Sequence, residues 1–283
     1  MIWQTARYQI DLSLPQVMGI VNVTPDSFSD GGLHAIPTRA LGHCEKLLTD
    51  GAHMLDIGGE STRPGAIALP LDEELARVLP VLREAVKFGV PVSVDTYKPE
   101  VMRAALDLGA DIINDIWALR QPGARAVVAG HGACGVCLMH MHREPATMQV
   151  QPMVGDVVPQ VRDFLVQAAQ SLQALGVGQG RIVLDPGIGF GKTVAQNFSL
   201  LARQSELCLA GYPVLAGWSR KSSLAAATST SLANLASMDV QARVVPSVAA
   251  ALLAVERGAR IVRVHDVRET IQALAVLKAL QSG

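Results

Sequence analysis

A glycine-rich segment around position 190 has the clearest chemical character in the chain. It reads Asp-Pro-Gly-Ile-Gly-Phe-Gly-Lys over residues 185–192. It does not match the Walker phosphate-binding pattern, because Pro186 occupies the position where that pattern requires its first glycine. It also lacks GxGxxG spacing. We expect its glycines to let the backbone approach a flat ligand closely. An ionised Asp185 can accept two parallel N–H bonds from an amidine edge; the alternative is that Asp185 caps a helix.

Three further polar residues suit the same flat ligand. Asp95 and Asn114 can pair with donors and acceptors on the edge of a heterocycle. Lys221 carries a compact point charge that suits a carbonyl oxygen. Together with Asp185 they predict a binding site for a planar, nitrogen-rich ring.

A second group of residues suggests an anion site. Arg263 and His265 are two positions apart, so on a strand their side chains point to one side. Asn22 adds an amide from what we expect to be the adjoining strand. Two potential cations beside an amide favour a bound anion; the alternative is a weak ion pair of these cations with Asp266 or Glu269.

Two motifs raise the question of a bound transition metal. Cys134 and Cys137 form a CxxC, but on a strand residues three apart face opposite sides and cannot share a metal, so we expect buried packing cysteines. His140 and His142 form an HxH, which can hold zinc or iron in some barrels. Too few further ligands follow it along the chain, yet a hydrolytic metal site remains an alternative.

The elements that must position these residues alternate regularly along the chain. Short apolar runs predict eight strands, at Val17–Val23, His53–Ile57, Val90–Val94, Asp111–Ile116, Ala133–Met139, Arg181–Leu184, Tyr212–Ala216 and Arg260–Val264. Segments of helical period lie between them, including Asp72–Lys87, Lys98–Leu108, Asp156–Leu175 and Pro246–Arg257. Glycines suited to helix C-termini follow six helices, at positions 51, 89, 109, 130, 176 and 258.

Alternating strands and helices predict a parallel sheet, and eight such units predict closure into a (β/α)8 TIM barrel. A doubly wound open sheet is the alternative. We expect one domain over residues 1–283, because no linker or change of composition divides the chain. In such barrels the functional groups collect at the C-terminal ends of the strands. Apart from the two cysteines, the candidate residues above fall at or just beyond such ends, so the sequence predicts one active site on that rim.

The composition excludes several classes of protein. The chain of 283 residues carries 24 basic and 25 acidic residues, a net charge of −1, so nothing indicates a nucleic-acid partner. Its longest apolar stretch, Val248–Val255, is far short of the roughly 18 residues that a membrane span needs. The polar residues within Met1–Leu14 are unlike a signal peptide, so we expect a cytoplasmic protein.

Eight segments, taken in order, resemble the dihydropteroate synthase family of folate biosynthesis, which sulfonamides inhibit. They are Met18–Gly32, Asp56–Gly65, Ser93–Thr96, Ile113–Asp115, Met139–Met141, Asp185–Lys192, Ser219–Ser222 and Arg263–Asp266. The resemblance implies a transferase that joins 4-aminobenzoate to a dihydropterin methyl diphosphate and releases pyrophosphate. It also implies an SN1-like departure of the diphosphate, Mg2+ as the cofactor, and a homodimer.

The resemblance also implies roles for particular residues. Those that bind the pterin or its diphosphate would be Thr62, Asp95, Asn114, Asp185, Lys221, Arg263 and His265. The 4-aminobenzoate site would consist of Thr62, Arg63, Phe190 and Ser222. Asn22 would contact Mg2+, and Asp30, Arg63 and Lys221 would take part in catalysis. We expect the loops that carry Phe28, Asp30, Thr62 and Arg63 to close only when the diphosphate and Mg2+ have bound.

Three competing functions remain open on the sequence. A pterin-binding methyltransferase would keep Asp95, Asn114 and Asp185 but has no use for Arg63 or the segment Ser219–Ser222. A paralogue that binds pterin without turnover is the second, and a metal hydrolase built on the HxH is the third. Pro246 and the stretch Leu224–Gln241 depart from the family pattern and put helix boundaries and oligomer packing in question.

Overall fold

The computed structural model describes residues 1–24, 32–61, 66, 68–144, 147–148, 150–228 and 241–282. Eight parallel strands form one sheet in the order β8-β7-β6-β5-β4-β3-β10-β9. Their bounds are β3 Gln16–Asn22, β4 Met54–Gly58, β5 Val92–Asp95, β6 Ile112–Asp115, β7 Gly135–Met139, β8 Ile182–Asp185, β9 Leu215–Ala216 and β10 Ile261–Val264. A parallel bridge between Leu184 and Val214 joins the two outer strands and closes the sheet into a barrel.

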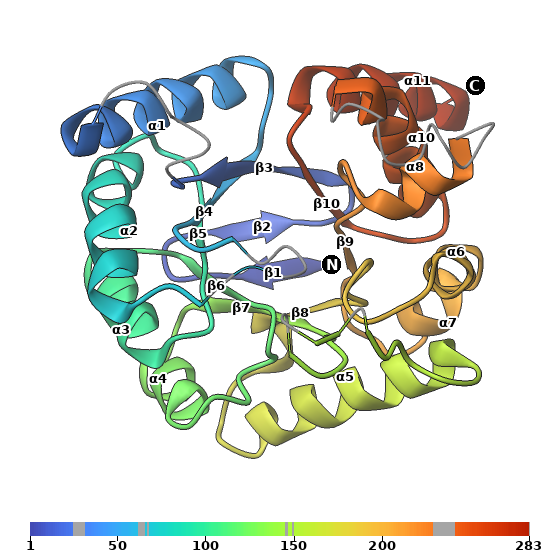
Figure 1. Cartoon of the computed structure of the whole chain (residues 1–283), viewed down its shortest axis with the longest axis horizontal. Coiled ribbons are helices and arrows are strands. Elements are labelled where there is room, and N and C mark those ends of the chain that lie inside the picture. Colours follow the sequence, from blue (N-terminus) through green and yellow to red (C-terminus); the bar gives the residue numbers. More distant parts are fainter. Residues whose placement is uncertain are drawn as a thin grey trace.

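Helices surround this barrel on its outside (Figure 1). They are α1 Gly32–Thr49, α2 Leu71–Ala85, α3 Pro99–Asp107, α4 Ala124–Gly130, α5 Val157–Gln173, α6 Val194–Ala202, α7 Gln204–Cys208, α8 Ser222–Thr228, α10 Val244–Glu256 and α11 Val267–Ser282. Two short 3-10 turns lie at Gln179–Arg181 and Gln241–Arg243. Most of the core lies between this ring and the strands, in two large apolar clusters. The closed barrel is therefore confirmed and the open sheet is wrong.

The eight predicted strands all occur, with ends that differ by up to three residues from the expected ones. The apolar runs locate them well because strands covered on both faces contain few polar residues. Five of the six predicted helix-end glycines have φ between +75° and +101°, as a left-handed C-terminal position requires. Gly130 was a wrong prediction: it is the last residue of α4 and does not follow it, and Gly132, with φ +75°, lies beyond that helix instead.

A hairpin at the N-terminus, formed by β1 Ile2–Gln4 and β2 Gln9–Asp11, was not predicted from the sequence. Its central side chain, Trp3, is fully buried and donates from Nε1 to the carbonyl of Arg181 at 3.0 Å. Arg7 binds both carboxylate oxygens of Asp111, at the start of β6, at 2.9 and 2.6 Å. The hairpin thus covers the N-terminal end of the barrel, opposite the rim where the candidate site residues lie.

Inside the barrel, an apolar layer at this closed end supports a polar layer near the rim. The lower layer includes Met18, Met54, Ile112, Cys137, Val183, Leu215 and Ile261, together with Trp3 and Leu12. Cys137 faces this interior while Cys134 lies in the outer cluster, so the two thiols face opposite sides of the sheet, as predicted. Within the described part of the chain, no helix is long and apolar enough to cross a membrane.

Candidate active site

The polar layer above this floor brings together residues from five strands. Parallel register places Gly58 beside Asp95, Asp95 beside Asn114, and Met139 beside Asp185. Asp56, two residues before Gly58, lies on the same face of β4 and is fully buried. Arg263 reaches the group from β10. The rim therefore contains one connected set of side chains, which consists of Asp56, Asp95, Asn114 and Arg263.

Arg263 is the centre of this set. Its Nε donates to Asp56 Oδ2 at 2.5 Å and its Nη2 to Asp95 Oδ2 at 2.7 Å. Burial raises the pKa of Asp95 to about 7, although the nearby Arg263 guanidinium opposes that shift. The alternative of an ion pair between Arg263 and Asp266 was wrong, because Asp266 binds Arg220 at 2.6 Å.

Asn114 is also held by the polar layer. Its Nδ2 donates to Asp56 Oδ2 at 3.1 Å, and the side chain is 5% exposed. Asp56 therefore accepts hydrogen bonds from two predicted ligand-binding residues, yet the sequence analysis gave it no role. Asp56 could have been found from the sequence, because it lies two residues after Met54, on the same face of a strand that is otherwise apolar. An unpaired carboxylate is rare in such a buried strand.

Asp185 ends β8 and turns the chain into the glycine-rich segment. Its Oδ1 accepts from the backbone N–H of Gly187 at 2.7 Å. Burial raises its pKa, and the Gly187 hydrogen bond opposes this. The alternative of a helix cap was wrong: the next helix, α6, begins at Val194 and is capped by Thr193 in a reciprocal pair with Gln196.

A buried lysine, Lys192, gives the glycine-rich segment its shape. Its Nζ donates to the carbonyls of Gly187 at 2.8 Å and Phe190 at 3.1 Å, and it contacts His140 Nδ1 at 2.9 Å. Burial lowers the pKa of Lys192 to about 7 and that of His140 to about 2. His140 is therefore neutral, and its Nδ1 accepts a hydrogen bond from Lys192 Nζ. The first histidine of the HxH motif therefore helps to hold the glycine-rich segment in place through Lys192.

The glycines of this segment serve chain packing more than ligand approach. A Cβ on Gly187 would lie 1.8 Å from the carbonyl oxygen of His140, and one on Gly191 would lie 2.6 Å from Cβ of His142. Both residues have positive φ, +66° and +71°. We expected the glycines to let a flat ligand approach. At Gly187 and Gly191, however, the backbone instead packs closely against His140 and His142, which follow β7.

We expect Gly187→Ala to lower the free energy of unfolding by about 3 kcal/mol or more, because steric overlap and backbone strain each cost about 1–3 kcal/mol. Urea unfolding followed by circular dichroism measures this change. Gly178→Ala is the matched control, since φ there is −63° and nothing lies within 4 Å of the added Cβ. Equal stability of the two variants would contradict the packing role of Gly187.

Lys221 and Phe190 face each other across the rim. The Nζ of Lys221 lies 4.3 Å from the centre of the Phe190 ring, which is a cation–π contact. Burial lowers the pKa of Lys221 to about 8, although Asp185 opposes that shift. Beside them is a cavity of about 210 Å3, lined among others by Gly189 and the exposed Ser222. Of these three predicted residues, Ser222 lines the cavity, and Phe190 and Lys221 adjoin its lining residues Gly189 and Ser222 along the chain.

His265 and Asn22 lie on the side of the rim near β10. His265 Nδ1 is 2.9 Å from Ser219 Oγ, and its backbone N–H donates to the same oxygen at 3.1 Å. Asn22 is the half-buried last residue of β3, in register with Gly58. Its side chain offers one neutral oxygen to a metal ion. The nearby carboxylates of Asp56 and Asp95 are already paired with Arg263.

This donor set fits a magnesium ion that arrives with a diphosphate and keeps several of its waters. It does not resemble a dedicated protein cage. Among the residues that the structure describes, no group of three or more His, Cys, Asp or Glu side chains could hold a metal ion.

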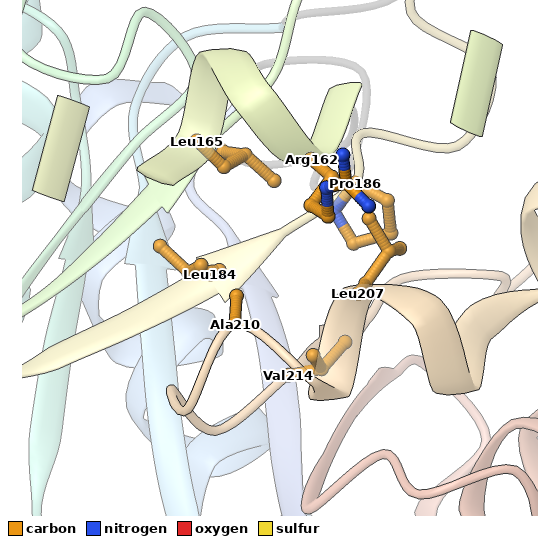
Figure 2. A pocket seen from close by; sticks show the side chains of 7 residues that line it. All are labelled: Arg162, Leu165, Leu184, Pro186, Leu207, Ala210 and Val214. Carbon is orange, nitrogen blue, oxygen red and sulfur yellow. The ribbon is translucent and has the colours of Figure 1, made fainter. Parts of the chain in front are cut away.

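A second gap in the barrel wall is not a binding site. It lies between α5 and α7 behind Pro186, and apolar side chains such as Leu165, Leu184 and Leu207 surround it (Figure 2). It leaves no room for a water-sized molecule. Its walls belong to the outer core of the barrel, and the one charged side chain among the lining residues, Arg162, is paired with Asp163.

Four predicted residues lie outside the described part of the chain: Phe28, Asp30, Thr62 and Arg63. The structure does describe the residues at which their segments leave the barrel. Val23 donates to the carbonyl of Gly58 at 2.8 Å, and Glu60 accepts from the hydroxyl of Tyr97 at 2.9 Å. The segments therefore leave from the C-terminal ends of β3 and β4, on the rim.

Comparison with known proteins agrees with this architecture. A family model for pterin binding enzymes matches residues 18–265. The dihydropteroate synthase of Neisseria meningitidis serogroup C is 49% identical over 282 residues, which is 99% of this chain and 97% of that protein.

Two solved structures extend the comparison to bound ligands. The Xanthomonas albilineans dihydropteroate synthase with 4-aminobenzoic acid has a TM-score of 0.89 and 50% identity, over 97% of this chain and 96% of that one. The Burkholderia cenocepacia dihydropteroate synthase complexed with 7,8-dihydropteroate has a TM-score of 0.88 and 49% identity, over 99% and 96%. The similarity thus extends over nearly the whole chain in sequence and in fold.

Proposed function

The chain belongs to the pterin-binding enzyme family, and we infer that it joins 4-aminobenzoate to (7,8-dihydropterin-6-yl)methyl diphosphate. The products are 7,8-dihydropteroate and pyrophosphate, so the chain is a transferase of folate biosynthesis. The observation in the structure that best supports this reaction is the row of acceptors formed by Asp95, Asn114 and Asp185 beside the ammonium group of Lys221.

We propose that this row binds the pterin ring. Asp185 uses Oδ1 for Gly187 and Asp95 uses Oδ2 for Arg263, so each has a second oxygen with no protein hydrogen bond among the described residues. Asn114 gives its NH2 group to Asp56, which leaves its carbonyl oxygen for a ligand. A 2-amino-4-oxo ring offers several N–H donors for these acceptors and one carbonyl for Lys221.

We propose that Arg263, His265 and Asn22 bind the departing diphosphate. Arg263 binds Asp56 and Asp95 through Nε and Nη2, so its remaining NH2 group can donate to a phosphate oxygen. Asn22 would contribute an oxygen to Mg2+, which when bound neutralises charge on the leaving group. As the C–O bond to the diphosphate breaks, these groups hold the pyrophosphate, and the electron-rich ring supports cationic character at the methylene carbon.

We propose that the amine is bound beside Phe190 and Ser222, with Thr62 and Arg63 on the facing loop and Asp30 on the loop after β3. Because the aniline nitrogen is already neutral, it needs no strong base to form the new C–N bond, and its surplus proton then passes to solvent. Lys221, next to Phe190 and Asp185, lies between the ring and amine subsites.

One assay tests the proposed reaction. Pyrophosphate release from the pterin diphosphate is measured with and without 4-aminobenzoate, and the organic product is identified by mass spectrometry. We expect release that depends on the amine, with formation of 7,8-dihydropteroate. Binding of the diphosphate without turnover would contradict catalysis and favour a paralogue that only binds pterin.

The assignment of Arg63 to the amine subsite gives a kinetic prediction. Arg63→Ala should leave pterin diphosphate affinity within about threefold, since the described acceptors of that ring are Asp95, Asn114 and Asp185. It should lower kcat/KM for 4-aminobenzoate about tenfold or more. Calorimetry and steady-state kinetics separate the two effects. A collapse of pterin binding with unchanged amine kinetics would place Arg63 in the pterin subsite.

We further propose a homodimer, a cytoplasmic location and a single domain over residues 1–283. Exposed apolar side chains on the last two helices, among them Val245 and Val276, support pairing through that face. The four cysteines are all free thiols, which suits a reducing compartment. A monomer in analytical ultracentrifugation at micromolar concentration would contradict the dimer.

A further inference from the structure

Asp56 is the one residue of the polar layer to which the proposed reaction gives no task. It lies in the middle of β4 and is 0% exposed. Its Oδ2 accepts from Asn114 Nδ2 at 3.1 Å and from Arg263 Nε at 2.5 Å. Both donors belong to residues that we assign to the substrate. Asp56 therefore contacts two side chains that we assign to the ligand, and it is itself buried beneath them.

The contact with Asn114 matters because an amide side chain has two chemically different ends. One end donates two hydrogen bonds and the other only accepts. An ionised carboxylate accepts only, so the NH2 end must face Asp56. The reversed amide would place two acceptors against each other in a buried position, which is costly. The Asn114 oxygen is thus turned toward the rim, where the ring edge lies in the proposed function.

The carboxylate of Asp56 is itself held in place. Arg263 binds it and Asp95 at the same time, so the guanidinium fixes both carboxylates relative to each other. The second oxygen of Asp56, Oδ1, is buried and has no hydrogen-bond partner, so no described group draws the carboxylate in another direction. The register neighbour Ser93 is also fully buried, and its Oγ has no hydrogen-bond partner among the described residues.

We propose that Asp56 is a positioning residue that orients the Asn114 amide, so that its oxygen and not its NH2 group is offered to an N–H of the pterin ring. This inference rests on the proposed function. Without Asp56, the Asn114 amide is free to turn. When the Asn114 amide is reversed, its NH2 group faces an N–H of the ring, and two donors cannot form a hydrogen bond. The protein molecules in that state cannot bind the pterin.

A double-mutant cycle tests the inference, with calorimetric titration of (7,8-dihydropterin-6-yl)methyl diphosphate into the full chain. We expect Asp56→Ala to raise the Kd about tenfold or more, and to raise it at most about threefold in the Asn114→Ala background. Equal factors in the two backgrounds would overturn the inference, because Asp56 would then act independently of Asn114. Ser93→Ala is the matched control and should leave the Kd unchanged.

An isosteric exchange of the two residues keeps the test available if Asp56→Ala does not fold. Asn114→Asp alone sets two carboxylates against each other and should weaken binding about tenfold or more. Adding Asp56→Asn restores one donor between them and the original net charge, although its NH2 group then opposes Arg263 Nε, which donates to the same position of residue 56. We therefore expect a partial recovery, with the Kd at least about threefold lower than in Asn114→Asp. An exchanged pair as weak as Asn114→Asp would overturn the inference. If the unchanged protein does not bind the diphosphate at all, the proposed function fails instead.

Discussion

Asp185→Asn is expected to weaken binding of the pterin diphosphate about tenfold to a hundredfold while the barrel stays folded. The asparagine can still accept from the Gly187 N–H through its oxygen, as Asp185 Oδ1 does at 2.7 Å. Its NH2 group, however, would replace the second oxygen and face the N–H groups of the ring. Loss of a charge-assisted hydrogen bond costs about 1.5–3 kcal/mol, which corresponds to that range of affinity.

Calorimetric titration measures the affinity, and thermal unfolding checks the fold. Asp163→Asn is the matched control, because this carboxylate lies on the outer surface of α5, where its side chain is 68% exposed and bonded to Arg162. The control should bind the diphosphate like the unchanged protein. An unaltered Kd for Asp185→Asn would remove Asp185 from the pterin site.

The barrel could be predicted from the sequence because its strands are buried on both faces. Each strand therefore reads as an apolar run, and the polar residues that end these runs mark the rim. The N-terminal hairpin could not be predicted in this way. Its strands have three residues each, and the contacts that stabilise it reach Arg181 and Asp111, far along the chain.

The residues of the site were easier to predict than the side chains to which they are hydrogen-bonded. Position at a strand end follows from the alternation of elements, which is local information. That Arg263 binds Asp56 and Asp95 depends on which strands meet across the closed barrel and at what stagger, and no local pattern encodes that. The same holds for Lys192, which reads as the end of a glycine-rich loop but binds His140, 52 residues earlier in the chain.

Arg263→Met is expected to lower the free energy of unfolding by about 3 kcal/mol or more at pH 8, because it leaves two buried carboxylates without their cation. Asp56 is fully buried, and the Asp95 side chain is 13% exposed. The methionine fills a similar volume, so the loss reports charge more than packing. Urea unfolding at several pH values measures it. Arg162→Met, which breaks only the exposed contact with Asp163, should change stability by about 0.5 kcal/mol or less.

The size of this loss should depend on pH in a definite direction. Burial raises the folded-state pKa of Asp95 to about 7, above the value of about 3.9 expected in the unfolded chain. Stability linked to Asp95 is therefore complete below pH 4 and is lost as the pH rises through 7. Arg263 opposes the raised pKa, so its removal moves the folded-state value further upward and widens that window. The deficit of Arg263→Met should thus be smaller at pH 5, where Asp95 is largely protonated in both proteins, and should grow toward pH 8. A deficit that stays constant between pH 5 and pH 8 would mean that Arg263 does not stabilise the barrel through its charge on Asp95.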